Sequence, residues 1–281
     1  CISWGNFTEG MQAFATAAYV SGFTFRENIT MRNAIGYGIA VWANDNSTTN
    51  NSVVTNWFGD GAILGYVSPT NRNTTFVGNT VAGISLALHN QLTGTFTNNV
   101  FLFDGDTETT PGSGMLFFDY PAKTVSQLTW TWDRNTYYST NYAVGSLFGL
   151  LTSDHSPGAL YSLANWRTHT GFDLNSTVND GWPTNIQTVS ARATDYDSTR
   201  VHVAVINTDT NTTNATLSLA SFGYTAGQSY ILRDAQDYFN PVTTAVYSGS
   251  TINLPLNRTN VSTITGDITH YTNTHTNVRY P

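Results

Sequence analysis

The chain has 281 residues, which is enough for one large domain or two ordinary ones with a sizeable core. Charged residues make up only 10% of it, and its formal net charge is −7 with 11 lysines and arginines. This balance argues against nucleic acid or an anionic membrane as a partner, because both bind clustered basic side chains. The 13% of aromatic residues, together with abundant Thr, Ser, Asn and Gly, is typical of an extracellular all-β protein.

The only cysteine, Cys1, excludes an intrachain disulfide and a cysteine-rich zinc site. The first residue is not Met, so we expect a processed chain or a fragment. No apolar run approaches the ~20 residues of a membrane-spanning helix, so no transmembrane segment is expected.

A repeated pattern, an apolar residue followed three positions later by Asn, runs through the first half of the chain. It occurs at Phe25/Asn28, Val53/Asn56, Phe76/Asn79, Phe96/Asn99 and Trp132/Asn135. After each Asn comes a glycine that opens an apolar run, at 38–41, 61–64, 83–86, 114–117 and 145–148. Met11–Thr16 is interpreted as part of an earlier copy.

Such a repeat predicts short β-strands that stack on one another and bury a continuous core. An Asn at each corner fits turn geometry, and stacked copies would form a ladder of side-chain hydrogen bonds. The alternative is a series of ordinary hairpins with Asn turns. We favour the stack because the order of features is kept while only the loops change length.

Over residues 11–151 this repeat resembles right-handed parallel β-helix proteins of the pectate-lyase-like superfamily. The resemblance implies an all-β chain with a parallel β-helix over residues 1–151. It says little about activity, because the fold serves many functions.

Residues 152–184 break the repeat and are interpreted as a capping helix and linker. Ser156-Pro157 is a typical helix start, Leu160, Leu163 and Trp166 form an apolar stripe, and Gly171 is a plausible stop. The helix would seal the open end of the stack.

Residues 185–256 predict a small antiparallel β-sandwich, because apolar and polar residues alternate there. Val201, Val203 and Val205 form one run, Leu217 and Leu219 a second, and Ile252, Leu254 and Leu256 a third. The stretch 166–256 is similar to the module that follows the helix in many bacterial β-helix proteins. Residues 257–281 form a polar tail that we expect to be held by its own domain or by a neighbouring subunit.

Calcium is one cofactor that the sequence suggests. Asp104, Asp106 and Glu108 alternate in a loop, where they can face one way and bind Ca²⁺. The resemblance supports this, since polysaccharide lyases of the fold often use Ca²⁺. The alternative is a solvated acidic loop.

Other candidates for chemistry are sparse. Asp45, Asp60, Asp119 and Asp133 could supply a carboxylate pair for glycoside hydrolysis, but they form no recognisable cluster and no catalytic residue is assigned. Trp130 and Trp132 share one face of a strand, as a sugar-stacking platform or as core packing, which we favour. His270 and His275 are expected to make hydrogen bonds rather than bind a metal.

Sequons for N-glycosylation are frequent, although only slightly more so than this composition gives by chance. The candidates are Asn6, Asn46, Asn50, Asn73, Asn175, Asn211, Asn214, Asn257 and Asn260. Asn28 also lies in a sequon, but a glycan there would conflict with an inward-facing ladder.

These features favour a structural protein, extracellular or at the cell surface, that self-associates into a fibre or surface assembly. An exposed end of the stack would need another subunit to cover it. The alternatives are a carbohydrate-active enzyme, either a polysaccharide lyase or a glycoside hydrolase, and an adhesin that binds glycans on the β-helix face.

Overall fold

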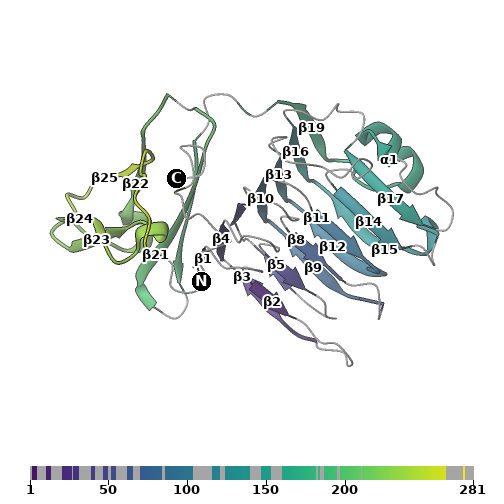
Figure 1. Ribbon diagram of the computed structural model, residues 1–281, viewed down its shortest axis with the longest axis horizontal. Helices are drawn as coiled ribbons and strands as arrows, with labels where there is room; N and C mark the ends of the chain where they lie inside the picture. Colours follow the sequence, from purple (N-terminus) through teal and green to yellow (C-terminus); the bar gives the residue numbers. More distant parts are fainter. Residues whose placement is uncertain are drawn as a thin grey trace. The chain divides into compact units, whose positions relative to one another are not determined.

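We describe the fold from a computed structural model. The structure describes residues 2–4, 11–13, 21–26, 28–31, 39–41, 47–49, 52–54, 62–65, 70–83, 86–103, 116–120, 124–139, 147–152, 160–181, 183, 187–194, 197–209, 211–263 and 275. These ranges are mostly β, with parallel and antiparallel sheets and a single α-helix (Figure 1). None of the helices within them has the length and hydrophobicity that crossing a membrane requires.

The chain divides into two compact units. One comprises Cys1 and Asn6–Trp182, and the other comprises Ile2–Gly5, which contains strand β1 (Ile2–Trp4), and Pro183–Pro281. The division at 182/183 lies two residues before the boundary expected at 184/185. The parallel strands continue to Asp180, well beyond the predicted end of the stack at residue 151.

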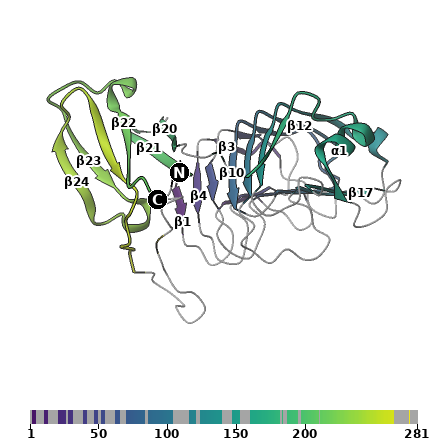
Figure 2. The same ribbon diagram turned by 90° about the horizontal axis from the view of Figure 1, so that it is seen from above.

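Three sheets of parallel strands build the first unit, and each sheet takes every third strand of the chain (Figure 1 and Figure 2). The first sheet includes β4 (Ile29–Met31), β7 (Ser52–Val54), β10 (Thr80–Gly83), β13 (Val100–Phe103), β16 (Thr136–Ser139) and β19 (Thr177–Asp180). The second contains β2 (Met11–Ala13), β5 (Ile39–Val41), β8 (Ala62–Leu64), β11 (Leu86–His89), β14 (Leu116–Tyr120) and β17 (Phe148–Thr152), with β18 (Leu160–Tyr161) antiparallel at its end. The third contains β3 (Thr24–Arg26), β6 (Ser47–Thr49), β9 (Thr74–Val77), β12 (Thr93–Thr97) and β15 (Thr129–Asp133).

Three consecutive strands, one in each sheet, form what we call a coil; β9, β10 and β11 are an example. The apolar runs at 38–41 and 61–64 supply β5 and β8 of the second sheet, while those at 83–86, 114–117 and 145–148 reach this sheet at their last described residues, Leu86, Leu116–Phe117 and Phe148; Gly83 instead ends β10 of the first sheet. Strand β2 confirms that Met11–Ala13 belong to an earlier coil. The alternative of antiparallel hairpins is therefore wrong for the described strands of these three sheets, apart from the β17–β18 pair.

The register of the third sheet corrects the repeat at one coil. Thr48 pairs with Phe25 on one side and Phe76 on the other, so it takes the place assigned to Val53. Val53 lies instead in β7 of the first sheet, paired with Val81. The matching corner position is 51, also an Asn, which lies outside the described residues, as does Asn56. A threonine at the register position of Phe25 and Phe76 hid this copy from a search for apolar residues.

The predicted asparagine ladder is confirmed at three corners. The side-chain oxygen of Asn99 accepts from the backbone amide of Asn79 at 2.9 Å and from its Nδ2 at 3.2 Å. Asn135 accepts in the same way from Asn99, at 3.0 Å for both donors. The Nδ2 atoms of Asn99 and Asn135 also donate to the carbonyls of Phe76 and Phe96. Asn99 is thus bonded to the coil on either side.

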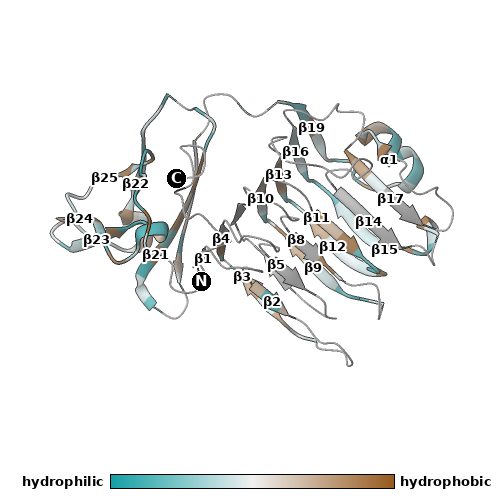
Figure 3. Cartoon of the chain, in the orientation of Figure 1, coloured by the Kyte–Doolittle hydropathy of each residue, from teal (hydrophilic) through white to brown (hydrophobic). Residues whose placement is uncertain are grey.

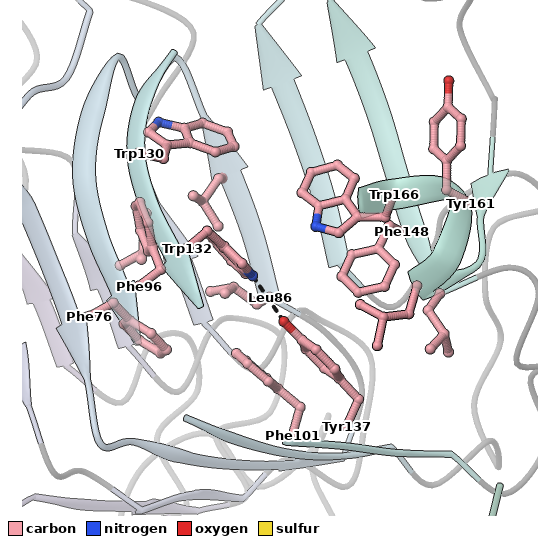
Figure 4. Close-up of a cluster of buried hydrophobic side chains, with 14 of the residues drawn as sticks. Phe76, Leu86, Phe96, Phe101, Trp130, Trp132, Tyr137, Phe148, Tyr161 and Trp166 are labelled. Atoms are coloured by element: carbon pink, nitrogen blue, oxygen red, sulfur yellow. Dashed lines mark hydrogen bonds between the residues drawn. The ribbon is translucent and has the colours of Figure 1, made fainter. Parts of the chain in front are cut away.

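Aromatic side chains fill the core of the first unit (Figure 4). In the third sheet Phe96 stacks on Trp132 with ring centroids 4.8 Å apart, and in the first sheet Phe101 stacks on Tyr137 at 5.3 Å. Their registers place like residues above one another, as a stack of coils requires. Burial of these large rings supplies most of the hydrophobic stabilisation.

The described residues contain one α-helix, α1 (Leu163–Thr170), which lies between β18 and β19 in the chain. A short 3₁₀ turn, η1 (Val125–Gln127), precedes β15. The predicted start at Ser156-Pro157 is wrong: Ser162 caps the helix, accepting from the amide of Asn165, and Leu160 lies in β18. The predicted stop at Gly171 is confirmed. Trp166 is fully buried and stacks on Phe148 at 4.9 Å, while Figure 3 shows hydrophilic positions on the same helix.

Antiparallel pairs of strands build the second unit, as predicted, in three two-stranded ladders that contribute to one core. They are β20 (Gln187–Thr194) with β21 (Asp197–Asn207), β22 (Asn214–Ser218) with β25 (Thr251–Pro255), and β23 (Ser229–Arg233) with β24 (Pro241–Val246). Two 3₁₀ turns, η2 (Leu219–Phe222) and η3 (Ala235–Asp237), complete it, so Leu219 is buried but is not in a strand. Its core contains Val205, Ala215, Leu219, Tyr247, Ile252, Leu254 and Leu256.

Candidate functional site

The tryptophan pair lies in the core. Trp130 and Trp132 share one face of β15, as predicted, but that face points inward, and Trp132 is only 2% exposed. Its Nε1 donates to the Tyr137 hydroxyl at 2.9 Å (Figure 4), and the Trp130 Nε1 donates to the carbonyl of Gln91. Buried rings leave no free face for a sugar. The sugar-stacking interpretation is therefore wrong and core packing is correct.

The structure does not bring the candidate carboxylates together at a described site. Asp133 ends β15, where its two oxygens accept the backbone amide and Nδ2 of Asn175, each at 2.7 Å. Burial works to raise the pKa of Asp133, but these bonds outweigh it and the pKa lies below its usual value. Asp119 lies in β14, in register with His89, while Asp45 and Asp60 fall outside the described residues.

The predicted calcium ligands Asp104, Asp106 and Glu108 also lie outside the described residues. Within the described ranges, His, Cys, Asp and Glu form no group of three that could hold a metal ion. Six of the candidate glycosylation asparagines lie within the described residues, and all six are exposed: Asn73, Asn175, Asn211, Asn214, Asn257 and Asn260. Asn28 is buried, as its corner position predicts, and Asn6, Asn46 and Asn50 lie outside the description.

A buried carboxylate, which the sequence analysis missed, ends the asparagine ladder. Asp173 follows α1 with a left-handed backbone and is 0% exposed. It accepts hydrogen bonds from the Tyr137 hydroxyl at 3.0 Å, the Trp166 Nε1 at 3.0 Å, the Asn135 Nδ2 at 3.3 Å and the Ser176 hydroxyl. Four side chains, two of them from β16 and α1 and two from the turns beside β16 and β19, therefore meet at one carboxylate.

Burial dominates the electrostatics of this cluster. It raises the pKa of Asp173 to about 6, against the lowering effect of the four donors. Burial and the neighbouring Asp173 charge raise the pKa of Tyr137 well above its usual value. Arg167 donates to the backbone carbonyls of Asp173 and Ser176, which clamps the loop. A perturbed pKa often marks a catalytic group, but a side chain that solvent cannot reach serves to join the elements around it.

Large apolar side chains are exposed on the β23–β24 ladder and the segment that joins its strands. Phe239 is 82% exposed, and Ile231, Tyr238 and Val246 are also exposed. The ring of Tyr238 meets that of Phe239 edge-on at 5.8 Å, and the guanidinium of Arg233 lies 5.2 Å from the Tyr238 centroid. We call these four apolar residues the hairpin face. Contiguous exposed apolar groups mark interaction sites on soluble proteins.

The described residues of the polar tail are held by η3 of their own unit. The ring of His275 lies 2.8 Å from Asp234 through Nε2, and Arg258 lies 3.6 Å from both Asp234 and Asp237. The amide of Ser262 donates to the carbonyl of Gln236 at 2.8 Å. The prediction that His275 makes a hydrogen bond is confirmed. At these positions the tail needs no neighbouring subunit to be ordered.

Comparison with known proteins gives no assignment: no family model, curated protein or solved structure matches this chain.

Proposed function

We propose that the first unit is a right-handed parallel β-helix like those of the pectate-lyase-like superfamily. Three observations support this: each sheet takes every third strand, like residues lie in register, and corner asparagines are bonded from coil to coil. This fold provides a stiff support for surfaces and does not by itself specify an activity.

The protein built on this support is an extracellular structural protein that self-associates into a fibre or surface assembly. The observation that carries this proposal is the hairpin face, where four large apolar side chains are exposed in one segment. The few charged residues of the chain give little electrostatic repulsion between copies. The tail, which the sequence suggested as the contact, is bonded to its own unit at Arg258, Ser262 and His275, so the hairpin face is the better interface.

Sedimentation velocity and negative-stain electron microscopy of the full chain test this proposal. We expect wild-type protein to form oligomers or filaments at micromolar concentration, and the double variant Ile231→Thr, Phe239→Ser to remain monomeric. Leu174→Ser is the matched control, because Leu174 is 65% exposed but lies outside the hairpin face. A wild-type protein that stays monomeric up to millimolar concentration would refute self-association. Equal assembly by the double variant would refute the hairpin face as its site.

A glycan-binding adhesin or a carbohydrate-active enzyme is the second candidate. The specific observation in its favour is the exposed pair Tyr238 and Phe239 beside Arg233, an arrangement that offers an aromatic ring and hydrogen-bond donors to a sugar. Pull-down with insoluble polysaccharides detects binding, and release of reducing or unsaturated ends detects an enzyme. Binding lost in Phe239→Ser without any change in sedimentation would favour this candidate over self-association.

Occupied sequons would support the extracellular location. The six exposed sequon asparagines are accessible to glycosylation in the folded chain. Intact mass before and after enzymatic deglycosylation of protein from its native source tests this, and identical masses would contradict it.

A further inference from the structure

The third sheet carries a row of hydroxyl residues along its whole described length. Strand pairing aligns Thr24 of β3, Ser47 of β6, Thr75 of β9, Thr95 of β12 and Thr131 of β15. A second row, two residues further along each strand, contains Arg26, Thr49, Val77, Thr97 and Asp133. Thr93 and Thr129 begin a third row. We call the three rows together the hydroxyl face.

Alternation along the strands places this face outward at the positions whose side chains the structure describes, which do not include Ser47. Phe76, Phe96 and Trp132 are buried between the hydroxyl residues, whereas Thr131 is exposed and Thr75 and Thr95 are half-buried. The other two sheets differ, since side chains on both of their faces are buried at several described positions: Val81 and Ala82 in β10, Phe101 and Leu102 in β13, and Leu86, Ala87 and Leu88 in β11. At the positions whose burial the structure describes, the outer face of the third sheet is therefore more accessible to solvent than the outer faces of β10, β11 and β13.

The backbone fixes the spacing of these side chains. Neighbouring strands lie about 4.8 Å apart, and residues two apart on one strand are about 6.6 Å apart. Thr95 and Thr97 on β12 thus lie at a regular interval in one direction, and Thr75, Thr95 and Thr131 do so in the other. The hydroxyl of Thr93 is engaged within the protein, since it accepts from the amide of Asn73 at 2.7 Å and donates to its Oδ1 at 3.0 Å. The asparagine ladder bonds the same coils at their corners, so little conformational freedom remains to be lost on binding.

The chemistry of the face suits a neutral, repeating ligand. Threonine presents a methyl group and a hydroxyl that both donates and accepts. The charged residues in the three rows, Arg26 and Asp133, stand at the two ends of the second row. A charged mineral or an acidic polymer would require charges within the array. The aromatic residues of these strands all point inward, which leaves no stacking platform for a sugar.

We propose that the hydroxyl face binds the surface of ice. Ice is a neutral lattice whose oxygen atoms donate and accept hydrogen bonds at repeats comparable with the strand spacing. Hydroxyls at fixed intervals can replace lattice waters, and the methyl groups between them favour an ordered layer of water over bulk solvent. Many weak contacts then add up because they form on one rigid surface. This inference is independent of the proposed self-association, which uses the other unit.

Partition of the purified chain into slowly growing polycrystalline ice tests the proposal, together with thermal hysteresis under a microscope. We expect wild-type protein to be at least tenfold enriched in the ice fraction relative to an inert protein of similar size, and to shape crystals. Thr95→Tyr places a bulky ring inside the first row, between Thr75 and Thr131, and should reduce the enrichment at least tenfold. Thr131→Tyr, at an exposed position of the same row, repeats the test if Thr95→Tyr fails to fold.

Thr177→Tyr is the matched control, because Thr177 is exposed on β19 of the first sheet. It should retain full enrichment, and tyrosine is well tolerated in strands. Circular dichroism and melting check that each variant is folded. Exclusion of wild-type protein from ice would overturn the proposal, as would folded row variants that behave like wild type. Binding to cellulose or chitin that Thr95→Tyr abolishes, without ice binding, would assign the face to a glycan instead.

Discussion

The side-chain oxygen of Asn135 accepts two hydrogen bonds from Asn99, one from its backbone amide and one from its Nδ2, both at 3.0 Å. The two residues are 36 positions apart in the sequence, yet they repeat the pairing between Asn79 and Asn99, which are 20 apart. The corners therefore hold a constant geometry while the loops between them vary in length. This constancy is what lets coils of unequal length stack in register.

Removal of one ladder side chain should lower the free energy of unfolding more than a substitution at an exposed position does. In Asn99→Ala the amide of Asn79 loses its acceptor and the carbonyl of Phe76 loses its donor, both in a buried site. We expect the free energy of unfolding to fall by about 3 kcal/mol. Thr129→Ala, at an exposed position of β15, should cost well under 1 kcal/mol. Urea unfolding followed by tryptophan fluorescence measures both, and equal losses would argue against the ladder as a source of stability.

Asp173 should make the first unit sensitive to pH. Its folded pKa of about 6 lies above the ordinary 3.8, so its contribution to stability is most favourable below pH 3.8 and is lost as the pH rises through 6. The difference corresponds to about 3 kcal/mol. The Asp173→Asn variant lacks this titration and tolerates the left-handed backbone. The unfolding free energy of wild type minus that of the variant should thus decrease between about pH 4 and pH 7; a constant difference would contradict the assignment.

Substitution by alanine should destabilise the protein to different extents at two glycines that both have a left-handed backbone conformation. A Cβ on Gly65 (φ +89°) would lie 1.8 Å from the carbonyl oxygen of His89, which is backbone and cannot move freely. A Cβ on Gly171 (φ +73°) would meet nothing within 4 Å. Gly171→Ala should cost about 1 kcal/mol for the left-handed conformation alone. Gly65→Ala should cost about 3 kcal/mol or more through the added clash. Thermal melts of the two variants measure the difference, and similar melting temperatures would be the contrary result.

The contacts of His275 and Arg258 with Asp234, which we call the tail anchor, should weaken in acid. Burial alone would raise the pKa of Asp234, but the bonds from His275 and the Gln236 amide and the charge of Arg258 lower it. Its contribution is therefore present above the ordinary carboxylate pKa and is lost as the pH falls through the lower, folded value. His275→Ala should speed proteolysis of the tail about tenfold at neutral pH, since the bond involves a charged group. Arg200→Ala removes an exposed ion pair with Asp197 and should leave the rate unchanged. Equal cleavage of wild type and His275→Ala would contradict the anchor.

Much of the stack is readable from the sequence because each coil repeats the same constraint. Asn79, Asn99 and Asn135 follow Phe76, Phe96 and Trp132 at a fixed interval, and both the inward ring and the corner amide leave a signal. The coil at Thr48 escaped because a threonine replaces the ring, so the apolar pattern moved forward to Val53. The helix start was misplaced because Ser156-Pro157 and Ser162 carry similar capping signals, and Ser162 is the one that caps α1.

Asp173 could not be anticipated, since its partners Asn135, Tyr137 and Trp166 approach it only through the fold. A single aspartate after a helix has no periodic neighbour to mark it. The hydroxyl face was equally hidden, because each strand contributes only a few hydroxyl residues and their alignment depends on the register. Composition indicated abundant threonine, but only the pairing of strands arranges it in rows.

The ladder also governs how such a chain can grow. Asn79, Asn99 and Asn135 accept or donate through the same atoms, so a duplicated segment from one corner to the next would meet compatible partners at both joints. At the far end the backbone amide of Asn135 donates to the hydroxyl of Ser176, which in turn donates a hydrogen bond to Asp173. Ser176 and Asp173 therefore take the place of the next corner asparagine, and the ladder ends there. A segment duplicated upstream of Asn135 would thus find asparagine partners at both joints, whereas a copy inserted after Asn135 would face Ser176 and Asp173 instead.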